Sequence, residues 1–349
     1  MGKKSTITHF SGHPAALTGI TKQRPEQQAT NPSVQCCENL PATEAPICSS
    51  LDFLPLEALA DTKASLQETV SVVIPALNEA ATIAGIITTL QNTLMRTVNL
   101  VDEIIVIDGG STDGTADIAS SAGALVYGID TLPSPHGLEA VRGKGAAIWK
   151  SLLKVHGSLV VCIDADIIEF DSRFVYGLIG SLLYNSQAVF SKAFYRRPLK
   201  IGNAVYDNYD GGRVTEILVR PLLSALYPAL SGICQPLSGE YAFRKDAAMT
   251  LPFSSGYGVE IGLLFDIYKK FGLKRCVQVD MDIRYHRNRP VQELSTMSLG
   301  IIETLFRKLE ADNVISLSAP MYKQLLVPGK NGLARIDVEE IELPPHVAG

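Results

Sequence analysis

Short apolar runs alternate with helix-patterned segments through the middle of the chain, and this alternation limits the possible folds more than any other feature. The expected strands cover residues 70–74, 104–107, 125–127 and 159–163. Apolar residues recur at helical spacing over residues 83–90 and 145–155. Strands that are apolar throughout and separated by helices are typical of a parallel sheet covered on both faces. The pattern therefore predicts an α/β fold with a mainly parallel sheet flanked by helices.

Composition excludes several classes of protein. The 349 residues are 46% hydrophobic, which suffices for one large core, or for one core with a smaller lobe. The net charge of −5 gives no general basic field for nucleic acid. The six cysteines form no CxxC pair, so reduced thiols and a cytoplasmic location are expected. The most apolar stretch, residues 177–190, is shorter than the about 20 residues of a membrane helix, which predicts a soluble protein without a membrane span.

The chain divides by composition into four parts. Residues 1–65 are rich in Pro, Gln, Thr, Ser and Ala and predict a disordered extension, with a weak helical pattern at 51–66. The alternating pattern predicts a first half at 66–195 and a second half at 196–326. Residues 327–349 contain several Gly and Pro residues and predict a C-terminal tail.

Polar residues follow the first two predicted strands. After the first strand, Pro75 is expected to end the ladder, leaving free backbone groups that could hold a ligand. Taken alone, this segment is better explained as an ordinary strand-to-helix turn. Asp108 follows the second strand, where its carboxylate could accept a hydrogen bond from a base or a ribose.

Two carboxylates, Asp164 and Asp166, follow the fourth predicted strand and flank Ala165. This arrangement suits a hard divalent cation that also binds phosphates, although a lone acidic turn would be unremarkable. The basic loop that contains Lys144 could face the same diphosphate, or it could simply be solvated.

The second half contains three further candidates. The glycine-rich segment at 211–215 opens a helical stretch, where free N–H groups with Arg213 could bind an anion. Residues 276–285 alternate as a strand that places Arg284 on its polar face, and His286 continues that face. Glu260 lies in the first turn of a predicted helix, where it could simply complement the helix dipole.

These motifs resemble a known family. In the first half, VIPALNE at 73–79, IDGGSTDGT at 107–115 and DAD at 164–166 resemble the GT-A nucleotide-sugar domain of glycosyltransferases. In the second half, five motifs resemble the glucosyl-3-phosphoglycerate synthase family: FYRRPL at 194–199, GGRVTE at 211–216, QPLSGEY at 235–241, GYGVEIG at 256–262 and HRNRP at 286–290. The resemblance covers about residues 70–309.

The resemblance implies a retaining glycosyltransferase that moves glucose from UDP-glucose to 3-phosphoglycerate and forms glucosyl-3-phosphoglycerate. It implies Mg²⁺ or Mn²⁺ bound by Asp166 and His286, with Glu260 and Asp166 as catalytic residues. The half at 66–195 is then the Rossmann-like donor half, and 196–326 is a smaller acceptor-binding lobe that completes the metal site. A homodimer is a further implication.

The resemblance also assigns the remaining site residues. The donor-binding residues are Pro75, Ala76, Leu77, Asn78, Glu79, Asp108, Lys144, Asp164, Ala165, Tyr257, Glu260, Arg284, Arg287 and Arg289. The acceptor-binding residues are Gly212, Arg213, Val214, Thr215 and Asn288.

Three alternatives stay open at this stage. The first is mannosyl transfer from GDP-mannose to the same acceptor, since the residues do not reveal the preferred base or sugar. The second is a polyprenyl-phosphate sugar transferase, which shares the first-half motifs but is expected to carry a membrane segment. The third is a nucleotide-binding regulator without catalytic activity, which is expected to have lost the DAD or the His286 motif.

Overall fold

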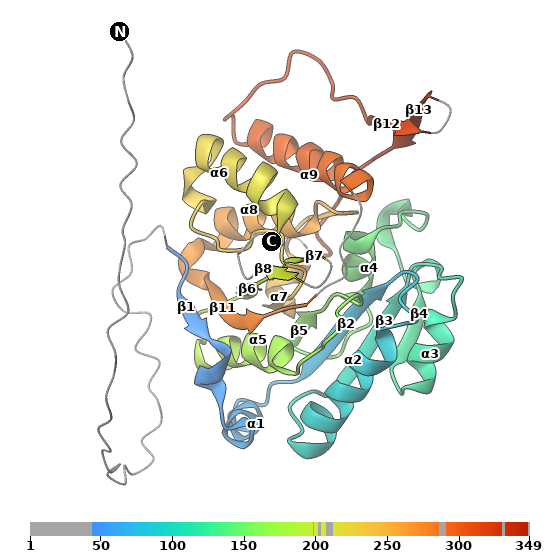
Figure 1. Ribbon diagram of the computed structural model, residues 1–349. Helices are drawn as coiled ribbons and strands as arrows, with labels where there is room; N and C mark the ends of the chain where they lie inside the picture. Colours follow the sequence, from blue (N-terminus) through green and yellow to red (C-terminus); the bar gives the residue numbers. More distant parts are fainter. Residues whose placement is uncertain are drawn as a thin grey trace. The chain divides into compact units, whose positions relative to one another are not determined.

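The computed structural model describes residues 44–197, 199–201, 204–206, 212–285, 291–329 and 332–347, and all of them belong to one compact unit (Figure 1). Its main sheet is built from β1 (Ile47–Ser49), β2 (Val70–Ala76), β3 (Glu103–Asp108), β4 (Leu125–Gly128), β5 (Leu159–Cys162), β6 (Phe190–Arg196), β9 (Tyr241–Arg244) and β11 (Cys276–Ile283). The strand order is β1-β11-β6-β9-β5-β2-β3-β4. β9 is antiparallel to both of its neighbours, and all other pairs are parallel.

Helices cover both faces of this sheet. One face packs against α1 (Leu56–Ser65), α2 (Ile83–Leu90), α3 (Thr115–Ser121) and α5 (Arg173–Tyr184). The other packs against α4 (Lys144–Ser151), α6 (Arg220–Leu226), α7 (Lys245–Met249), α8 (Val259–Phe271) and α9 (Val291–Ala311). Successive side chains of a strand point to opposite faces, so Val72 joins the first core and Val73 the second. The predicted fold class is confirmed.

Smaller elements complete the unit. Three short antiparallel pairs are β7 (Leu199–Ile201) with β8 (Ala204–Tyr206), β10 (Phe253–Ser254) with β14 (Glu342–Leu343), and β12 (Gln324–Gly329) with β13 (Gly332–Asp337). Single 3₁₀ turns are Ser50–Phe53, Ile129–Thr131, Pro135–Gly137, Pro228–Leu230 and Leu273–Arg275, and π-helical turns are Gln91–Thr97 and Thr215–Val219. Within the part of the chain that the structure describes, no helix combines the length and apolarity needed to cross a bilayer.

The strand that carries the first motif is longer than expected. Pro75 was predicted to end the ladder, but β2 passes through it and ends at Ala76. Pairing with β5 stops at Val73, whereas pairing with β3 continues through Pro75 to Ala76. The ladder of β2 therefore ends earlier on the β5 side than on the β3 side, and the missing proline N–H does not interrupt the pairing with β3.

The N-terminal extension is shorter than predicted. Residues 44–65 were assigned to it, but β1 adds a parallel strand beside β11, and α1 follows after a 3₁₀ turn. A three-residue strand held by main-chain pairing leaves almost no periodic pattern, which is why the sequence did not reveal it. Leu59 of α1 is completely buried and anchors this segment to the core.

The C-terminal residues are also part of the fold rather than a tail. Leu343 of β14 is completely buried, and the ring of His346 stacks on that of Trp149 with centroids 4.3 Å apart. The indole Nε1 of Trp149 donates to the carbonyl oxygen of Pro344 over 2.8 Å. The predicted boundary after residue 195 lies inside β6, so both halves of the chain contribute strands to one sheet.

Candidate active site

One cavity of about 650 Å³ brings together most of the residues singled out in the sequence. The predicted residues that line it are Pro75, Ala76, Leu77, Asn78, Glu79, Lys144, Asp164, Ala165, Asp166, Gly212, Arg213, Val214, Thr215, Tyr257, Glu260 and Arg284. It lies beyond the carboxyl ends of β2 and β5, where ligands of open α/β sheets bind. Asp108 is not part of the lining, although its neighbours Ile107 and Gly109 are. His286, Arg287, Asn288 and Arg289 lie outside the described residues.

The turns after β2 and β3 hold each other in place. Asn78 has a φ of 58°, a left-handed conformation that asparagine tolerates better than most residues. Its backbone N–H donates to the Ser111 hydroxyl over 2.9 Å, and its side-chain oxygen accepts from the N–H of Thr112 over 2.9 Å. The Ser-Thr-Asp turn therefore shapes the neighbouring 75–79 turn and does more than cap the helix that follows it.

Asp108 stabilises the turn after β3. It is 9% exposed, and its Oδ2 atom accepts from the N–H groups of Gly110 and Ser111, each over 3.0 Å. Its other oxygen, Oδ1, is buried and has no hydrogen-bond partner within the described chain. The structure therefore assigns Asp108 to the turn, and its role in donor binding stays a prediction.

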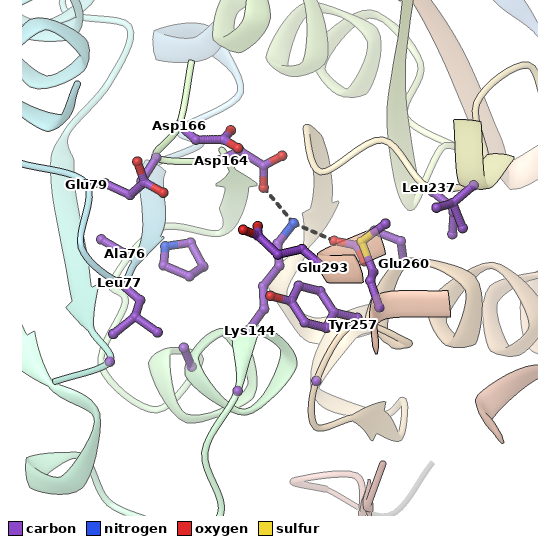
Figure 2. Close-up of a pocket in the computed structure, with 18 of the residues that line it drawn as sticks. Ala76, Leu77, Glu79, Lys144, Asp164, Asp166, Leu237, Tyr257, Glu260 and Glu293 are labelled. Atoms are coloured by element: carbon purple, nitrogen blue, oxygen red, sulfur yellow. Dashed lines mark hydrogen bonds and ion pairs between the residues drawn. The ribbon is translucent and has the colours of Figure 1, made fainter. Parts of the chain in front are cut away.

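Lys144 bridges the two sides of the cavity (Figure 2). Its Nζ lies 2.6 Å from Asp164 Oδ1 and 2.6 Å from Glu260 Oε1. Asp164 follows β5, and Glu260 lies in the first turn of α8. Figure 2 shows Ala76, Leu77, Glu79 and both aspartates on one side of the Lys144 ammonium group, with Tyr257 and Glu260 on the other. One ammonium group thus joins the two halves of the site.

The bridge stays charged at physiological pH. Burial alone would lower the pKa of Lys144, but Asp164 and Glu260 outweigh burial and raise it. Burial would likewise raise the pKa of Asp164, yet Lys144 and Arg284 hold that pKa below its usual range. These pKa directions favour the charged forms of Lys144 and Asp164 near neutral pH, which suits an electrostatic role better than general acid–base catalysis.

Arg284 lies beside both aspartates. Its Nη2 is 3.2 Å from Asp164 Oδ2, 3.2 Å from Asp166 Oδ1 and 3.0 Å from Glu240 Oε1, and its side chain is 3% exposed. The sequence predicted Arg284 on the polar face of its strand, together with Asp280 and Asp282. That placement is wrong, because the ladder of β11 shifts register between Asp280 and Ile283 and Asp282 has a φ of 65°. The bulge turns Arg284 inward.

The aspartate pair suits a hard divalent cation. Asp164 and Asp166 supply carboxylate oxygens, which Mg²⁺ and Mn²⁺ prefer, and both line the cavity where a diphosphate would lie. Nowhere in the described part of the chain do three His, Cys, Asp or Glu side chains gather closely enough to hold a metal ion. The predicted second ligand, His286, falls outside that part and stays a prediction.

Several lining residues escaped the sequence analysis. Arg197 lines the cavity and donates from Nη2 to the Tyr195 hydroxyl over 2.7 Å. One side of the cavity is formed by α9, with Glu293, Leu294, Met297 and Ile301. Arg197 belongs to a recognised motif and could have been assigned. The α9 residues have an ordinary amphipathic pattern, and nothing in it distinguishes a cavity wall from a core contact.

Comparison with known proteins defines the class first. Residues 71–215 match glycosyl transferase family 2, and they include both turns, Lys144 and the aspartate pair. The mannosyl-3-phosphoglycerate synthase of Rubrobacter xylanophilus is a structural neighbour, with a TM-score of 0.76 and 37% identity over 86% of this chain and 94% of its own. The chain is a glycosyltransferase of this fold.

Two further comparisons define the family. The chain is 40% identical over 300 residues to the glucosyl-3-phosphoglycerate synthase of Petrotoga mobilis, covering 84% of this chain and 91% of that one. The corresponding enzyme of Mycobacterium tuberculosis, solved with Mn²⁺, UDP-glucose and phosphoglyceric acid, superposes with a TM-score of 0.70 at 40% identity over 83% of this chain and 93% of its own. That enzyme was also solved with Mg²⁺ and UDP. This chain belongs to the glucosyl-3-phosphoglycerate synthase family.

Replacing Asp166 by Ala should abolish turnover while the fold stays intact. Asp166 is 16% exposed at the cavity wall, so its loss would remove the predicted metal-binding oxygen without opening the core. We expect the rate to fall by about a thousandfold or more, as loss of metal assistance predicts. Glu169→Ala, at an exposed position outside the cavity, is the matched control. Near-normal turnover of Asp166→Ala, measured as nucleotide release, would contradict the metal assignment.

Proposed function

We propose that this chain transfers glucose from UDP-glucose to 3-phosphoglycerate in the presence of Mg²⁺ or Mn²⁺ and forms glucosyl-3-phosphoglycerate. The proposal is supported by one cavity that is lined both by the predicted donor turn at 75–79 and by the predicted acceptor loop at 212–215. Membership of the glucosyl-3-phosphoglycerate synthase family supports the same substrates.

The donor binds on the side of β2, β3 and β5 in this proposal. Residues 75–79 would contact the nucleoside, and Asp164 and Lys144 would orient the diphosphate and sugar. Asp108 stays a predicted donor contact. Tyr257, 41% exposed at the opposite wall, offers a ring surface to the sugar. Arg287 and Arg289 stay predicted donor contacts.

Asp166 and His286 would hold the divalent cation. A bound cation neutralises the negative charge that develops on the departing diphosphate. Arg284, two positions before His286 in the sequence, lies against Asp166, which supports an arrangement in which this strand end completes the metal site. Arg284 also contributes a fixed positive charge beside the leaving group.

The acceptor binds at the start of the helical segment after residue 212. Gly212, Arg213, Val214 and Thr215 all line the cavity, and free N–H groups at a helix start attract a phosphate. This segment continues as a π-helical turn, Thr215–Val219, that leads directly into α6. Arg197 adds a second guanidinium to the acceptor side, and Asn288 stays a predicted contact.

In the transfer, the bond between the anomeric carbon and the diphosphate oxygen breaks, and the acceptor hydroxyl oxygen bonds to that carbon. The acceptor proton passes to the departing phosphate oxygen, so no separate base is required. Glu260, held by Lys144 at the cavity wall, is the candidate to stabilise positive charge at the anomeric carbon. Orientation and electrostatics then supply most of the rate, and we propose retention of configuration on the basis of the resemblance.

A cytoplasmic location and a homodimer remain part of this proposal. Within the described chain, Cys162, Cys234 and Cys276 are free thiols, which supports a reducing compartment.

Mannosyl transfer from GDP-mannose is the second candidate, because the synthase of Rubrobacter xylanophilus named for mannosyl transfer superposes with a TM-score of 0.76. The two candidates share their acceptor and differ in base and sugar. A regulator without activity is disfavoured, since both aspartates line the cavity.

A panel of nucleotide sugars tests the proposal directly. The protein is incubated with 3-phosphoglycerate, Mg²⁺ and either UDP-glucose, GDP-glucose or GDP-mannose, and the released nucleotide is measured. We expect kcat/KM for UDP-glucose to exceed that for GDP-mannose by about tenfold or more, with release stopped by EDTA. Faster release from GDP-mannose would favour the mannosyl reaction, and binding without release from any donor would favour the regulator.

Replacing Arg213 by Ala should weaken the acceptor and spare the donor. A guanidinium that pairs with a phosphate contributes a charge-assisted bond, so we expect KM for 3-phosphoglycerate to rise by about tenfold or more. KM for UDP-glucose should change by less than about twofold, because the substitution removes no contact to the donor. Arg96→Ala, outside the cavity, is the control. Equal changes in both KM values would argue against an acceptor role for Arg213.

A further inference from the structure

Glu340 is a buried carboxylate near the C-terminus that faces away from solvent and contacts the loop after β10. It is 4% exposed and lies between β13 and β14. Its Oε2 accepts from the backbone N–H of Gly256 over 2.8 Å, and its Oε1 accepts from that of Gly258 over 3.2 Å. These amides directly precede α8, whose first N–H groups have no partner within the helix.

The surroundings of Glu340 fit this carboxylate closely. A Cβ atom on Gly256 would lie 2.5 Å from Glu340 Oε1, and one on Gly300 of α9 would lie 2.7 Å from the same atom. Both distances are shorter than real carbon–oxygen contacts allow, so any side chain at either position would displace Glu340. Glycine at positions 256 and 300 therefore leaves the space that the Glu340 carboxylate occupies.

Other bonds fasten the same two segments. The N–H of Ser255 donates to the carbonyl oxygen of Ile341 over 2.8 Å, and the N–H of Ile341 donates to the Ser255 hydroxyl over 3.0 Å. The C-terminal segment also contacts α9, because Arg307 of that helix donates to the carbonyl oxygen of Glu340. The C-terminal segment is thus bound both to the loop and to the helix that lines the cavity.

The opposite side of this loop faces the Lys144 bridge. The N–H of Ala146, two residues after Lys144, donates to the carbonyl oxygen of Ser255 over 2.8 Å. The loop also carries Tyr257 and leads into Glu260, and both of these line the cavity. Glu340 itself does not line the cavity, so its effect on the site must pass through the loop.

We propose that Glu340 is a positioning residue for the donor side of the site. By holding the amides of Gly256 and Gly258, it sets the position of Tyr257 and keeps Glu260 within reach of Lys144. Through Glu340, the C-terminal segment thus helps to set the geometry of the active site. This inference rests on the proposed function, because it takes Tyr257 and Glu260 to face the donor sugar.

Glu340→Gln is the variant that tests the proposal. Its amide group keeps the size of the side chain, but its NH₂ faces one backbone N–H and cannot accept from it. We expect amide hydrogen exchange in residues 256–260 to speed up by about tenfold or more, since local opening becomes easier. We also expect kcat/KM for UDP-glucose to fall by about tenfold to a hundredfold, while KM for 3-phosphoglycerate changes by less than about twofold.

Glu339→Gln is the matched control, since its side chain is 60% exposed and pairs with Lys323 over 2.8 Å. Glu340→Asp is a second variant, which keeps the charge but shortens the reach, and it should shift both quantities in the same direction. Unchanged exchange in 256–260, or faster exchange with unaltered donor kinetics, overturns the proposal. If the unaltered protein shows no turnover with any donor, the proposed function fails. Amide hydrogen exchange in 256–260 and UDP binding by calorimetry then still test whether Glu340 positions the loop.

Discussion

The ammonium group of Lys144 is the contact on which the rest of the site depends. Asp164 and Glu260 come from distant parts of the chain, and both lie 2.6 Å from this one nitrogen. Without a cation between them, two largely buried carboxylates would repel each other and would each lack compensation for lost hydration. The bridge therefore fixes the width of the cavity between its two walls.

A second cation extends the same principle. Arg284 contacts Asp164, Asp166 and Glu240, so the aspartate pair lies between two fixed positive charges. These charges orient the carboxylates, and in the proposed mechanism they lie beside the departing diphosphate. In the proposed transfer, no side chain has to accept or donate a proton. The transfer needs carboxylates, cations and the loop before α8 in fixed positions.

Much of this could be predicted from the sequence, for one physical reason. The carboxyl ends of parallel strands lie at the same edge of the sheet. The 75–79 turn and the aspartate pair each follow such a strand, so they were expected to lie close together. The alternation of strands and helices does not predict that Glu260 and the 212–215 loop lie near that edge. The family resemblance predicted that they belong to the same site. All of these residues line one cavity.

The parts that could not be predicted have physical causes as well. The bulge at Asp282 reverses the side on which Arg284 lies, and a period of two cannot foresee an extra residue in a strand. β1 and β14 are held by main-chain pairing, which leaves little trace in side-chain pattern. Glu340 appeared to belong to a tail, because only the folded chain brings it beneath Gly256.

Calorimetric binding of UDP to Lys144→Met, with Mg²⁺ present, tests the central claim most directly. Methionine keeps the length of the side chain and removes its charge, and Lys154→Met, outside the cavity, is the matched control. With circular dichroism establishing that the variant is folded, the account predicts UDP affinity weaker by about tenfold or more, because Asp164 and Glu260 lose the charge that holds them together. Unchanged affinity in a folded Lys144→Met protein would contradict the account.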